Sequence, residues 1–354
     1  MIRVVRTEQT IELNVGHKEN LEMNNTVRRM LSIGWFVHVL FVIPAIADMP
    51  AYNPLTVSSQ VAPEIVDCEV TDGQRQRDIP IRVYLPPVKS PSPVILFSHG
   101  LCGSREVSAY LGKHWTARGY VAVFLQHPGS DISVCKDKPR RKRMAAMREA
   151  ANGRNFLLRV KDIPTVLDQL ERWNKTDEHV LAGKLNLKKI GMSGHSFGAM
   201  TTQAVSGQRT KGGREIFTDP RIAAAVVMSP SRPRRGTPQA AFGKVSLPWL
   251  LMTGTKDIAP IGNADMESRL AVYPALPTGG KYELVLHGAE HSVFTERALP
   301  RDSEPLNPNH HRAIMALTTA FWDSYLLNDS SAKDWLDGAG PRSVLEKDDT
   351  WQKK

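Results

Sequence analysis

Cysteine is scarce in this chain: 354 residues contain only three, Cys68, Cys102 and Cys135. That number excludes a disulfide scaffold, so an apolar core must stabilise the fold. If the protein is exported, one bridge can form. Cys102 with Cys135 is then the favoured pair, because both fall in loops at one end of the predicted sheet, and two unpaired thiols are the alternative. Cys68 lies in an alternating run and is expected to be a small strand residue.

Repeats and low-complexity segments are also absent, and 41% of the residues are apolar. This composition excludes a disordered chain, and the length allows one large α/β domain or two modest ones. Acidic residues are outnumbered, with 36 Asp and Glu against 46 Lys and Arg and a net charge of +10.

Much of the basic excess is concentrated in residues 136–143 and 232–235. Both segments contain proline and are expected to be solvated loops. The alternative is a weak association with anionic surfaces, or an anionic substrate near the site. No nucleic-acid-binding motif accompanies them, so nucleic acid is not an expected partner.

No uninterrupted apolar run is long enough to span a membrane. Residues 30–43 are largely apolar, but polar residues and a glycine interrupt them and Pro44 stops them. A basic pair, Arg28-Arg29, precedes this stretch, and an A-x-A pattern ending at Ala47 follows it. The pattern predicts a signal peptide cleaved after Ala47, and therefore a periplasmic or secreted protein whose export route stays open.

Short apolar runs alternate with segments of helical spacing along most of the chain. The runs, expected to be strands covered on both faces, lie at residues 94–97, 120–125, around 190, 222–228, 249–252 and 282–286. Helices are expected over 104–118, in 144–173, from the turn after residue 190 through 205, and over about 310–327. Residues 63–71 and 79–85 are expected to form a hairpin.

This alternation predicts an α/β fold, with a mainly parallel central sheet, helices on both of its faces and an N-terminal antiparallel hairpin. We expect three segments. Residues 1–47 would be the N-terminal extension and signal peptide, residues 48–328 the domain, and residues 329–354 a polar, loosely held tail.

The most informative motif is a G-x-S-x-G pentapeptide, residues 194–198, directly after the strand around Ile190. At a tight strand-to-helix turn the serine backbone is strained, and its hydroxyl stands clear of the sheet edge. Flanking glycines are needed because a β-carbon there would collide with the strand or the helix. Ser196 is therefore the candidate nucleophile. Ser193 is a weaker rival because His195 stands where its second glycine should be.

A serine hydroxyl becomes a good nucleophile only with a base and an acid that orients it. Asp257 follows the run at 249–252 and His291 follows the run at 282–286, and the order Ser, Asp, His is the one expected of an α/β-hydrolase. His287 is the rival base. The rival carboxylates are Asp219, Asp265 and Glu267.

The tetrahedral intermediate of acyl transfer needs two preplaced donors, each worth about 3 kcal/mol of barrier. The backbone N–H groups of Phe197, after the serine, and Leu101, in the loop after residues 94–97, are expected to supply them. His99 and His195 are expected to be packing or hydrogen-bonding residues of the two turns. Asp131 is expected to order the loop beside the site, with substrate contact as the alternative.

At these residues the chain resembles bacterial α/β-hydrolases described as predicted dienelactone hydrolases, relatives of the platelet-activating-factor acetylhydrolase family. The similar stretches, within about residues 64–327, are 97–105, 126–131, 194–198, 219–222 and 288–291. The resemblance implies one α/β-hydrolase domain, no metal or organic cofactor and hydrolysis of carboxylic esters with short acyl groups. It also implies Ser196, Asp257 and His291 as the triad, and Leu101 and Phe197 as oxyanion donors.

The chain departs from the family pattern at one position, since Cys102 stands where glycine is more usual in the oxyanion loop. The dienelactone label itself fits poorly, because true dienelactone hydrolases use a cysteine nucleophile and this chain has serine. We expect a serine esterase acting on short- to medium-chain esters, acetylhydrolase- or lipase-like. The alternatives are a cutinase-like polyesterase, a peptidase or amidase with the same triad, and a catalytically silent binding protein.

Overall fold

The computed structural model describes residues 51–57, 61–262, 264–298, 302–303 and 305–354. The predicted signal peptide, residues 1–47, lies outside the described residues. The described residues belong to one compact unit, so a single domain holds every residue of the predicted site.

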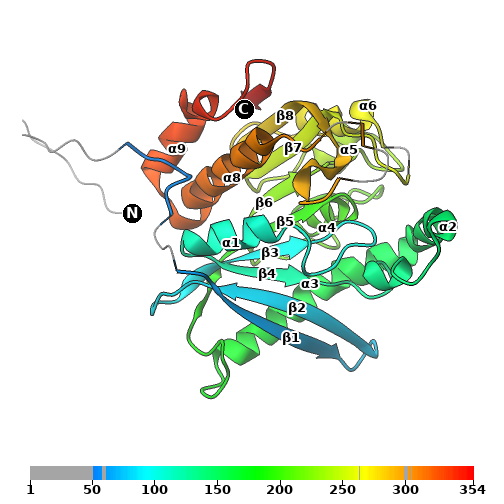
Figure 1. Ribbon diagram of the computed structural model, residues 1–354, viewed down its shortest axis with the longest axis vertical. Coiled ribbons are helices and arrows are strands. Elements are labelled where there is room, and N and C mark those ends of the chain that lie inside the picture. Colours follow the sequence, from blue (N-terminus) through cyan, green and yellow to red (C-terminus); the bar gives the residue numbers. More distant parts are fainter. Residues whose placement is uncertain (1–50, 58–60, 263, 299–301, 304) are drawn as a thin grey trace, which may run out of the picture. The chain divides into compact units, whose positions relative to one another are not determined.

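A nine-stranded sheet is the central element of the described chain (Figure 1). Its order is β1-β2-β4-β3-β5-β6-β7-β8-β9. The strands are β1 (Glu64–Asp72), β2 (Arg77–Leu85), β3 (Ser92–Ser98), β4 (Val121–Leu125), β5 (Leu185–His195), β6 (Ile222–Met228), β7 (Trp249–Lys256), β8 (Lys281–Glu290) and β9 (Thr350–Lys353).

The six strands from β3 to β8 are parallel to one another. The predicted hairpin is confirmed, because β1 pairs antiparallel with β2 along its whole length, and β2 in turn is antiparallel to β4. At the other edge β9 is antiparallel to β8. The carboxyl ends of these parallel strands all lie at the same end of the sheet. The loops after β3, β5, β7 and β8 therefore lie close together there.

Helices cover both faces of the sheet. They are α1 (Ala109–Ala117), α2 (Arg140–Ala150), α3 (Gly153–Asn174), α4 (Phe197–Val205), α5 (Pro238–Phe242), α6 (Met266–Leu270), α7 (Val272–Ala275), α8 (Pro308–Trp322) and α9 (Ser330–Asp337). Four short helical turns lie at Ile132–Val134, His291–Phe294, Asp323–Leu327 and Gly340–Ser343.

Alternation within each strand divides the core into two layers, as β3 illustrates. Val94 and Leu96 pack into a cluster with α3, whereas Ile95 and Phe97 pack on the opposite face with α1 and α8. Residues 94–97 are apolar at every position because both faces of the strand are buried.

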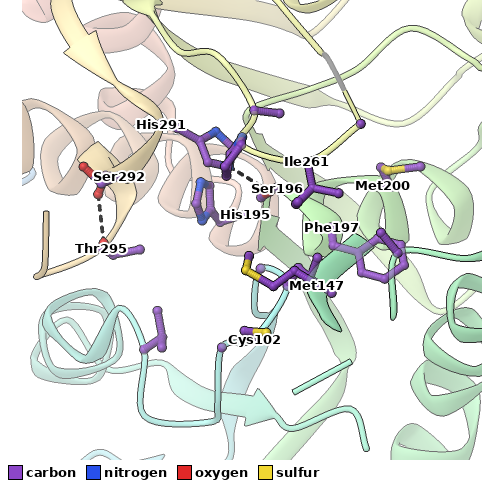
Figure 2. Close-up of a pocket in the computed structure, with 18 of the residues that line it drawn as sticks. Cys102, Met147, His195, Ser196, Phe197, Met200, Ile261, His291, Ser292 and Thr295 are labelled. Atoms are coloured by element: carbon purple, nitrogen blue, oxygen red, sulfur yellow. Dashed lines mark hydrogen bonds between the residues drawn. The ribbon is translucent and has the colours of Figure 1, made fainter. Parts of the chain in front are cut away.

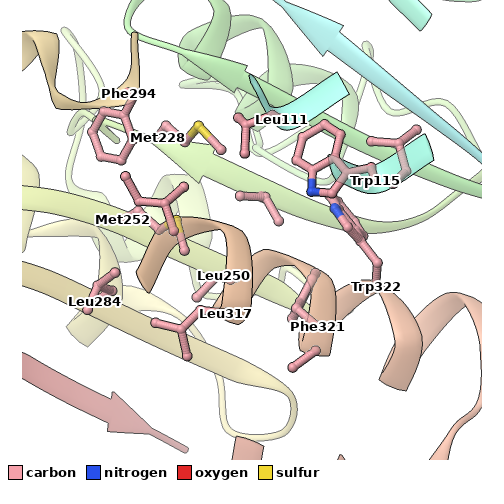
Figure 3. Packing of buried hydrophobic residues seen from close by; sticks show 14 of the residues in the cluster. Leu111, Trp115, Met228, Leu250, Met252, Leu284, Phe294, Leu317, Phe321 and Trp322 are labelled. Carbon is pink, nitrogen blue, oxygen red and sulfur yellow. The ribbon is translucent and has the colours of Figure 1, made fainter. Parts of the chain in front are cut away.

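The layer under α1 and α8 is rich in large side chains (Figure 3). Trp115 of α1 meets Trp322 of α8 edge to face, with ring centroids 6.1 Å apart. The buried indole N–H of Trp115 donates to Thr318 Oγ1 at 3.1 Å, so its polar atom is satisfied. This packing fixes the closing helix against the sheet that presents the site.

The expectation of a loosely held tail at residues 329–354 is wrong. Leu336 of α9 is fully buried, and Trp351 of β9 stacks on Tyr282 of β8 with centroids 5.5 Å apart. Asp349 is buried and accepts hydrogen bonds from the backbone N–H of His287 and Glu346. The segment reads as polar because β9 is an edge strand with mostly exposed side chains.

The expectation of a loop over the first basic segment is also wrong in part. Residues 140–150 form α2, because arginine, lysine, alanine and methionine all favour helix. The second basic segment, residues 232–235, lies outside helices and strands, as predicted.

Candidate active site

Ser196 occupies the turn between β5 and α4 with a strained backbone, φ 59° and ψ −112°. The flanking glycines are required by space. A β-carbon on Gly198 would lie 1.8 Å from the Ser98 carbonyl oxygen, and one on Gly194 would lie 2.5 Å from the Gly198 oxygen. The two glycines therefore permit this tight turn, which places Ser196, half-buried, at the end of a central strand.

The structure brings the three predicted side chains into one hydrogen-bonded relay, of which Figure 2 shows the contact between Ser196 and His291. His291 Nε2 lies 2.8 Å from Ser196 Oγ, and His291 Nδ1 lies 2.6 Å from Asp257 Oδ1. Asp257 follows β7, and His291 begins the helical turn after β8. This geometry allows the imidazole to take the hydroxyl proton while the carboxylate holds its ring.

Asp257 is fully buried and well supplied with donors. Ser229 Oγ and Thr253 Oγ1 donate to Oδ2 at 2.6 and 2.9 Å, and Arg269 Nη2 donates to Oδ1 at 3.2 Å. Burial acts to raise the pKa of Asp257, but the charge and hydrogen bond of His291 and the charge of Arg269 outweigh it and lower the pKa below its ordinary value. The carboxylate is therefore ionised near neutral pH.

Arg269 of α6 is a member of the site that sequence reasoning missed. It is buried, and its guanidinium donates to the carbonyl oxygens of Ser229 and Pro230 and to Asp257. It thus ties the loop after β6 to the loop after β7. A lone arginine in a five-residue helix carries no sequence signal of this role.

The rival serine and histidine lie elsewhere. Ser193 is buried within β5 and donates to the Leu96 carbonyl oxygen. His287 is exposed, and neither side chain lines the pocket that contains Ser196. His195 is buried with its ring centroid 4.7 Å from that of His291, and burial lowers its pKa well below the ordinary value. His195 therefore packs against the base as a neutral ring.

The rival carboxylates are engaged outside the relay. Asp219 pairs with Arg221 at 2.7 Å, Asp265 caps the first turn of α6, and Glu267 pairs with Arg232 at 2.9 Å. Asp131 is buried and accepts from Gln126 Nε2 at 2.7 Å. Asp131 therefore orders its own loop, as expected.

The two predicted oxyanion donors flank Ser196. Phe197 is the first residue of α4, where backbone N–H groups have no acceptor within the helix, and no side-chain cap comes from Ser196. Leu101 lies in the turn after β3, and its N–H makes no hydrogen bond to another described residue. A β-carbon on Gly100 would be 3.4 Å from Ser196 Cβ, so this turn lies against the serine.

A disulfide joins Cys102 to Cys135, which confirms the favoured pairing, with 6.0 Å between the Cα atoms. Cys102 adopts a positive φ of 60°, the conformation for which glycine is more usual there. Its N–H donates to the Ser130 carbonyl oxygen at 2.9 Å. The bridge thus fastens the turn of Leu101 to the neighbouring loop. Cys68 is unpaired and lies in β1, as predicted.

The relay opens into a pocket of about 1340 Å³. Figure 2 shows apolar side chains around Ser196, among them Met147, Met200 and Ile261. Toward the rim the lining includes more cations than anions: Arg105, Lys136, Arg232, Arg234 and Arg297 against Glu106 and Glu296. A medium-sized organic group fits this space, and a negative charge on it would be favoured.

Among residues placed by the structure, no three His, Cys, Asp or Glu side chains are arranged to hold a metal ion. Over the same residues, no helix combines the length and apolarity that a membrane crossing requires. A scan against protein-family models and a search of curated proteins both found no match to this chain.

Proposed function

We propose that the protein is a serine carboxylic-ester hydrolase with an α/β-hydrolase fold, acting through an acyl-enzyme on short- to medium-chain esters. One observation carries the proposal. His291 lies 2.8 Å from Ser196 Oγ and 2.6 Å from Asp257, at the wall of a pocket that Leu101 and Phe197 also line. The sheet order and the resemblance to predicted dienelactone hydrolases support the same family.

In the acylation half, Ser196 Oγ attacks the ester carbon while its proton moves to His291 Nε2. The carbonyl oxygen becomes an oxyanion, which accepts from the N–H groups of Leu101 and Phe197. Collapse breaks the bond to the alcohol, and His291 returns the proton to that leaving oxygen. Asp257 stabilises the imidazolium in between.

In the second half, water attacks the acyl-serine and gives its proton to His291. The same two N–H groups bind the second oxyanion. Collapse releases the carboxylic acid and returns the proton to Ser196. Water is the only reactant besides the ester, and each proton taken up by His291 is returned within the cycle.

Two alternatives within hydrolysis use the same relay, a cutinase-like polyesterase and a peptidase or amidase. Hydrolysis of an amide needs, in addition, protonation of the leaving nitrogen by His291. A pocket of about 1340 Å³ favours a small substrate over a polymer chain laid along a surface.

Export and partners belong to the same proposal. The disulfide supports an oxidising compartment, because such bonds persist outside the cytosol. The exposed cations of α2 and of the pocket rim support weak association with anionic surfaces, or an anionic group on the substrate.

The test is hydrolysis of p-nitrophenyl acetate by the purified protein and by Ser196→Ala, with Ser193→Ala as a matched control in the same segment. We expect turnover by the wild type, near-complete loss in Ser196→Ala and retention in Ser193→Ala. Turnover that survives in Ser196→Ala would refute the proposal.

Panels of substrates distinguish the esterase from the amidase and the polyesterase. On p-nitrophenyl esters from acetate to palmitate we expect kcat/KM to be highest for the short acyl groups, and equal or better rates on palmitate would contradict that. Faster turnover of p-nitroanilides than of esters would favour the amidase. Release of soluble acids from a polyester film at comparable rates would favour the polyesterase.

A further inference from the structure

Arg159 of α3 is a fully buried cation beside the candidate site. Within the described part of the chain, no carboxylate lies at ion-pair distance from it. Burying a charge is unfavourable, and burial lowers the pKa of Arg159 to about 9, although the charges of Asp162 and Asp131, beyond ion-pair distance, act in the opposite direction. A guanidinium kept at that cost, and still charged near neutral pH, calls for a specific reason.

Its hydrogen bonds converge on the turn after β3. Nη1 donates to the His99 carbonyl oxygen at 2.7 Å, and Nη2 lies 3.4 Å from the Gly100 carbonyl oxygen and 3.2 Å from His99 Nδ1. Nε donates to Ser130 Oγ at 2.8 Å. The planar guanidinium thus contacts two successive carbonyl oxygens of the turn, those of His99 and Gly100. It also binds Ser130, whose own carbonyl oxygen accepts from the Cys102 N–H.

The Gly100 carbonyl and the Leu101 N–H belong to one peptide group. In a planar trans peptide the two point in opposite directions, so a donor that holds the carbonyl also sets the direction of the N–H. The same bond polarises the peptide and strengthens its N–H as a donor. Besides Arg159 Nη2, the Gly103 N–H at 3.0 Å and His99 Nδ1 at 2.6 Å contact the Gly100 carbonyl oxygen, so the guanidinium is one of three groups that together direct the Leu101 N–H to the other side of the peptide.

The same guanidinium also reaches the second donor. Arg159 Cζ lies 4.5 Å from the centroid of the Phe197 ring, a cation–π contact within the buried core. Phe197 is the residue whose N–H begins α4, next to Ser196. One side chain therefore contacts both turns that contribute to the oxyanion hole, although β3 and β5 supply them separately.

We propose that Arg159 is a positioning residue for the oxyanion hole, which fixes the Leu101 and Phe197 N–H groups at the spacing that the tetrahedral intermediate requires. The inference rests on the proposed function. It does not make Arg159 a group that touches substrate, since Arg159 is fully buried and does not line the pocket that contains Ser196.

The experiment compares Arg159→Met and Arg159→Lys with a matched control, Arg77→Met. Arg77 is a nearly buried arginine of the same polar cluster, but it contacts Asp162 and the Pro128 carbonyl rather than the turn of Leu101. All variants are assayed well below their melting temperatures. The readouts are kcat and KM for p-nitrophenyl acetate and the Ki of a trifluoromethyl ketone.

The ketone is the discriminating probe, because its adduct with Ser196 places an oxyanion in the hole without any leaving group. For Arg159→Met we expect kcat to fall about 10²-fold to 10³-fold, the loss typical of one oxyanion donor. KM should change little, and Ki should rise in parallel with the loss in kcat. Arg159→Lys, which keeps the charge but not the fork, should fall in between.

Arg77→Met should lose stability but keep kcat and Ki, because no bond to the turn is removed. If Arg159→Met does not fold, the Lys variant decides by the same parallel change. A folded Arg159 variant with wild-type kcat, or one that loses kcat while its Ki stays at the wild-type value, would overturn the inference. If Ser196→Ala retains turnover, the proposed function itself is wrong, so the two failures are distinguishable.

Discussion

Two Ser–His–Asp relays occur among the described residues, and they differ in almost everything except their hydrogen bonds. In the second relay Ser98 Oγ lies 2.9 Å from His127 Nε2, and His127 Nδ1 lies 2.8 Å from Asp162 Oδ2. These distances match those of the relay at Ser196. The spacing of three side chains is therefore not what makes one serine a candidate nucleophile.

Access and backbone distinguish the two. Ser98, His127 and Asp162 are all fully buried, and none lines the large pocket. Ser98 ends β3 in ordinary strand conformation, whereas Ser196 stands on a strained turn beside unpaired N–H groups. A substrate carbonyl can therefore reach the Ser196 hydroxyl but not the Ser98 hydroxyl.

Charge also differs between the relays. Arg75 and Arg77 both pair with Asp162 at 2.8 Å, whereas Asp257 pairs with one arginine, Arg269, at 3.2 Å. Burial and the charge of Arg159 lower the pKa of His127 to about 4. His127 therefore remains a neutral hydrogen-bonding link between Ser98 and Asp162, and this relay supports the turn held by Arg159.

The largest expected difference lies in the nucleophiles. Ser196→Ala should lower kcat by about 10⁶-fold, because the nucleophile and its base act as a unit. Ser98→Ala should stay within about 10-fold of wild type, because that hydroxyl only supports the turn. A fluorophosphonate probe, followed by mass spectrometry of the peptides, should label Ser196 and leave Ser98 unmodified. Labelling of Ser98 in the folded protein would show that burial does not protect it.

The next largest difference is expected between the two aspartates, Asp257 and Asp162. Asp257→Asn should lower kcat about 10⁴-fold with little change in KM, because the amide favours the wrong tautomer of His291. Asp162→Asn should instead lower the free energy of unfolding by about 3–5 kcal/mol, since two arginines lose a buried partner. Urea unfolding and kcat, measured on the same preparations, check both. Equal losses of kcat in the two variants would remove the distinction between the relays.

The sequence identified the relay at Ser196 because each member follows an apolar run. The end of a buried strand can be predicted from its apolar run, and Ser196, Asp257 and His291 come directly after β5, β7 and β8. The relay at Ser98 could not be predicted from the sequence in this way. Asp162 lies within the helix α3 and Ser98 is the last residue of a strand, and neither position marks a loop.

Arg159 was missed for a related reason. Its position in α3 is on the same face as Ile163 and Val166, four and seven residues later, and a polar residue on an apolar face is a signal that could have been used. Which acceptors it meets there depends on tertiary packing. Likewise β9 could not be predicted, because four mostly exposed edge residues carry no apolar pattern.

The smallest effect expected is one of pH on stability, and it belongs to the buried relay. The imidazole of His127 binds a proton below about pH 6.5 in the unfolded chain but only below about pH 4 in the fold. The unfolded state thus binds more protons between these values, and acidification from pH 6.5 to 4.5 should cost about 2 kcal/mol through this residue.

Urea unfolding of His127→Gln at the two pH values should show that loss reduced. It should not be abolished, because burial also lowers the pKa of His114 to about 4 and adds a slope of the same sign. His287→Gln, at an exposed histidine, is the matched control and should keep the wild-type slope. A wild-type slope in His127→Gln would mean that folding does not lower the pKa of this imidazole, and that burial in the second relay does not keep it neutral.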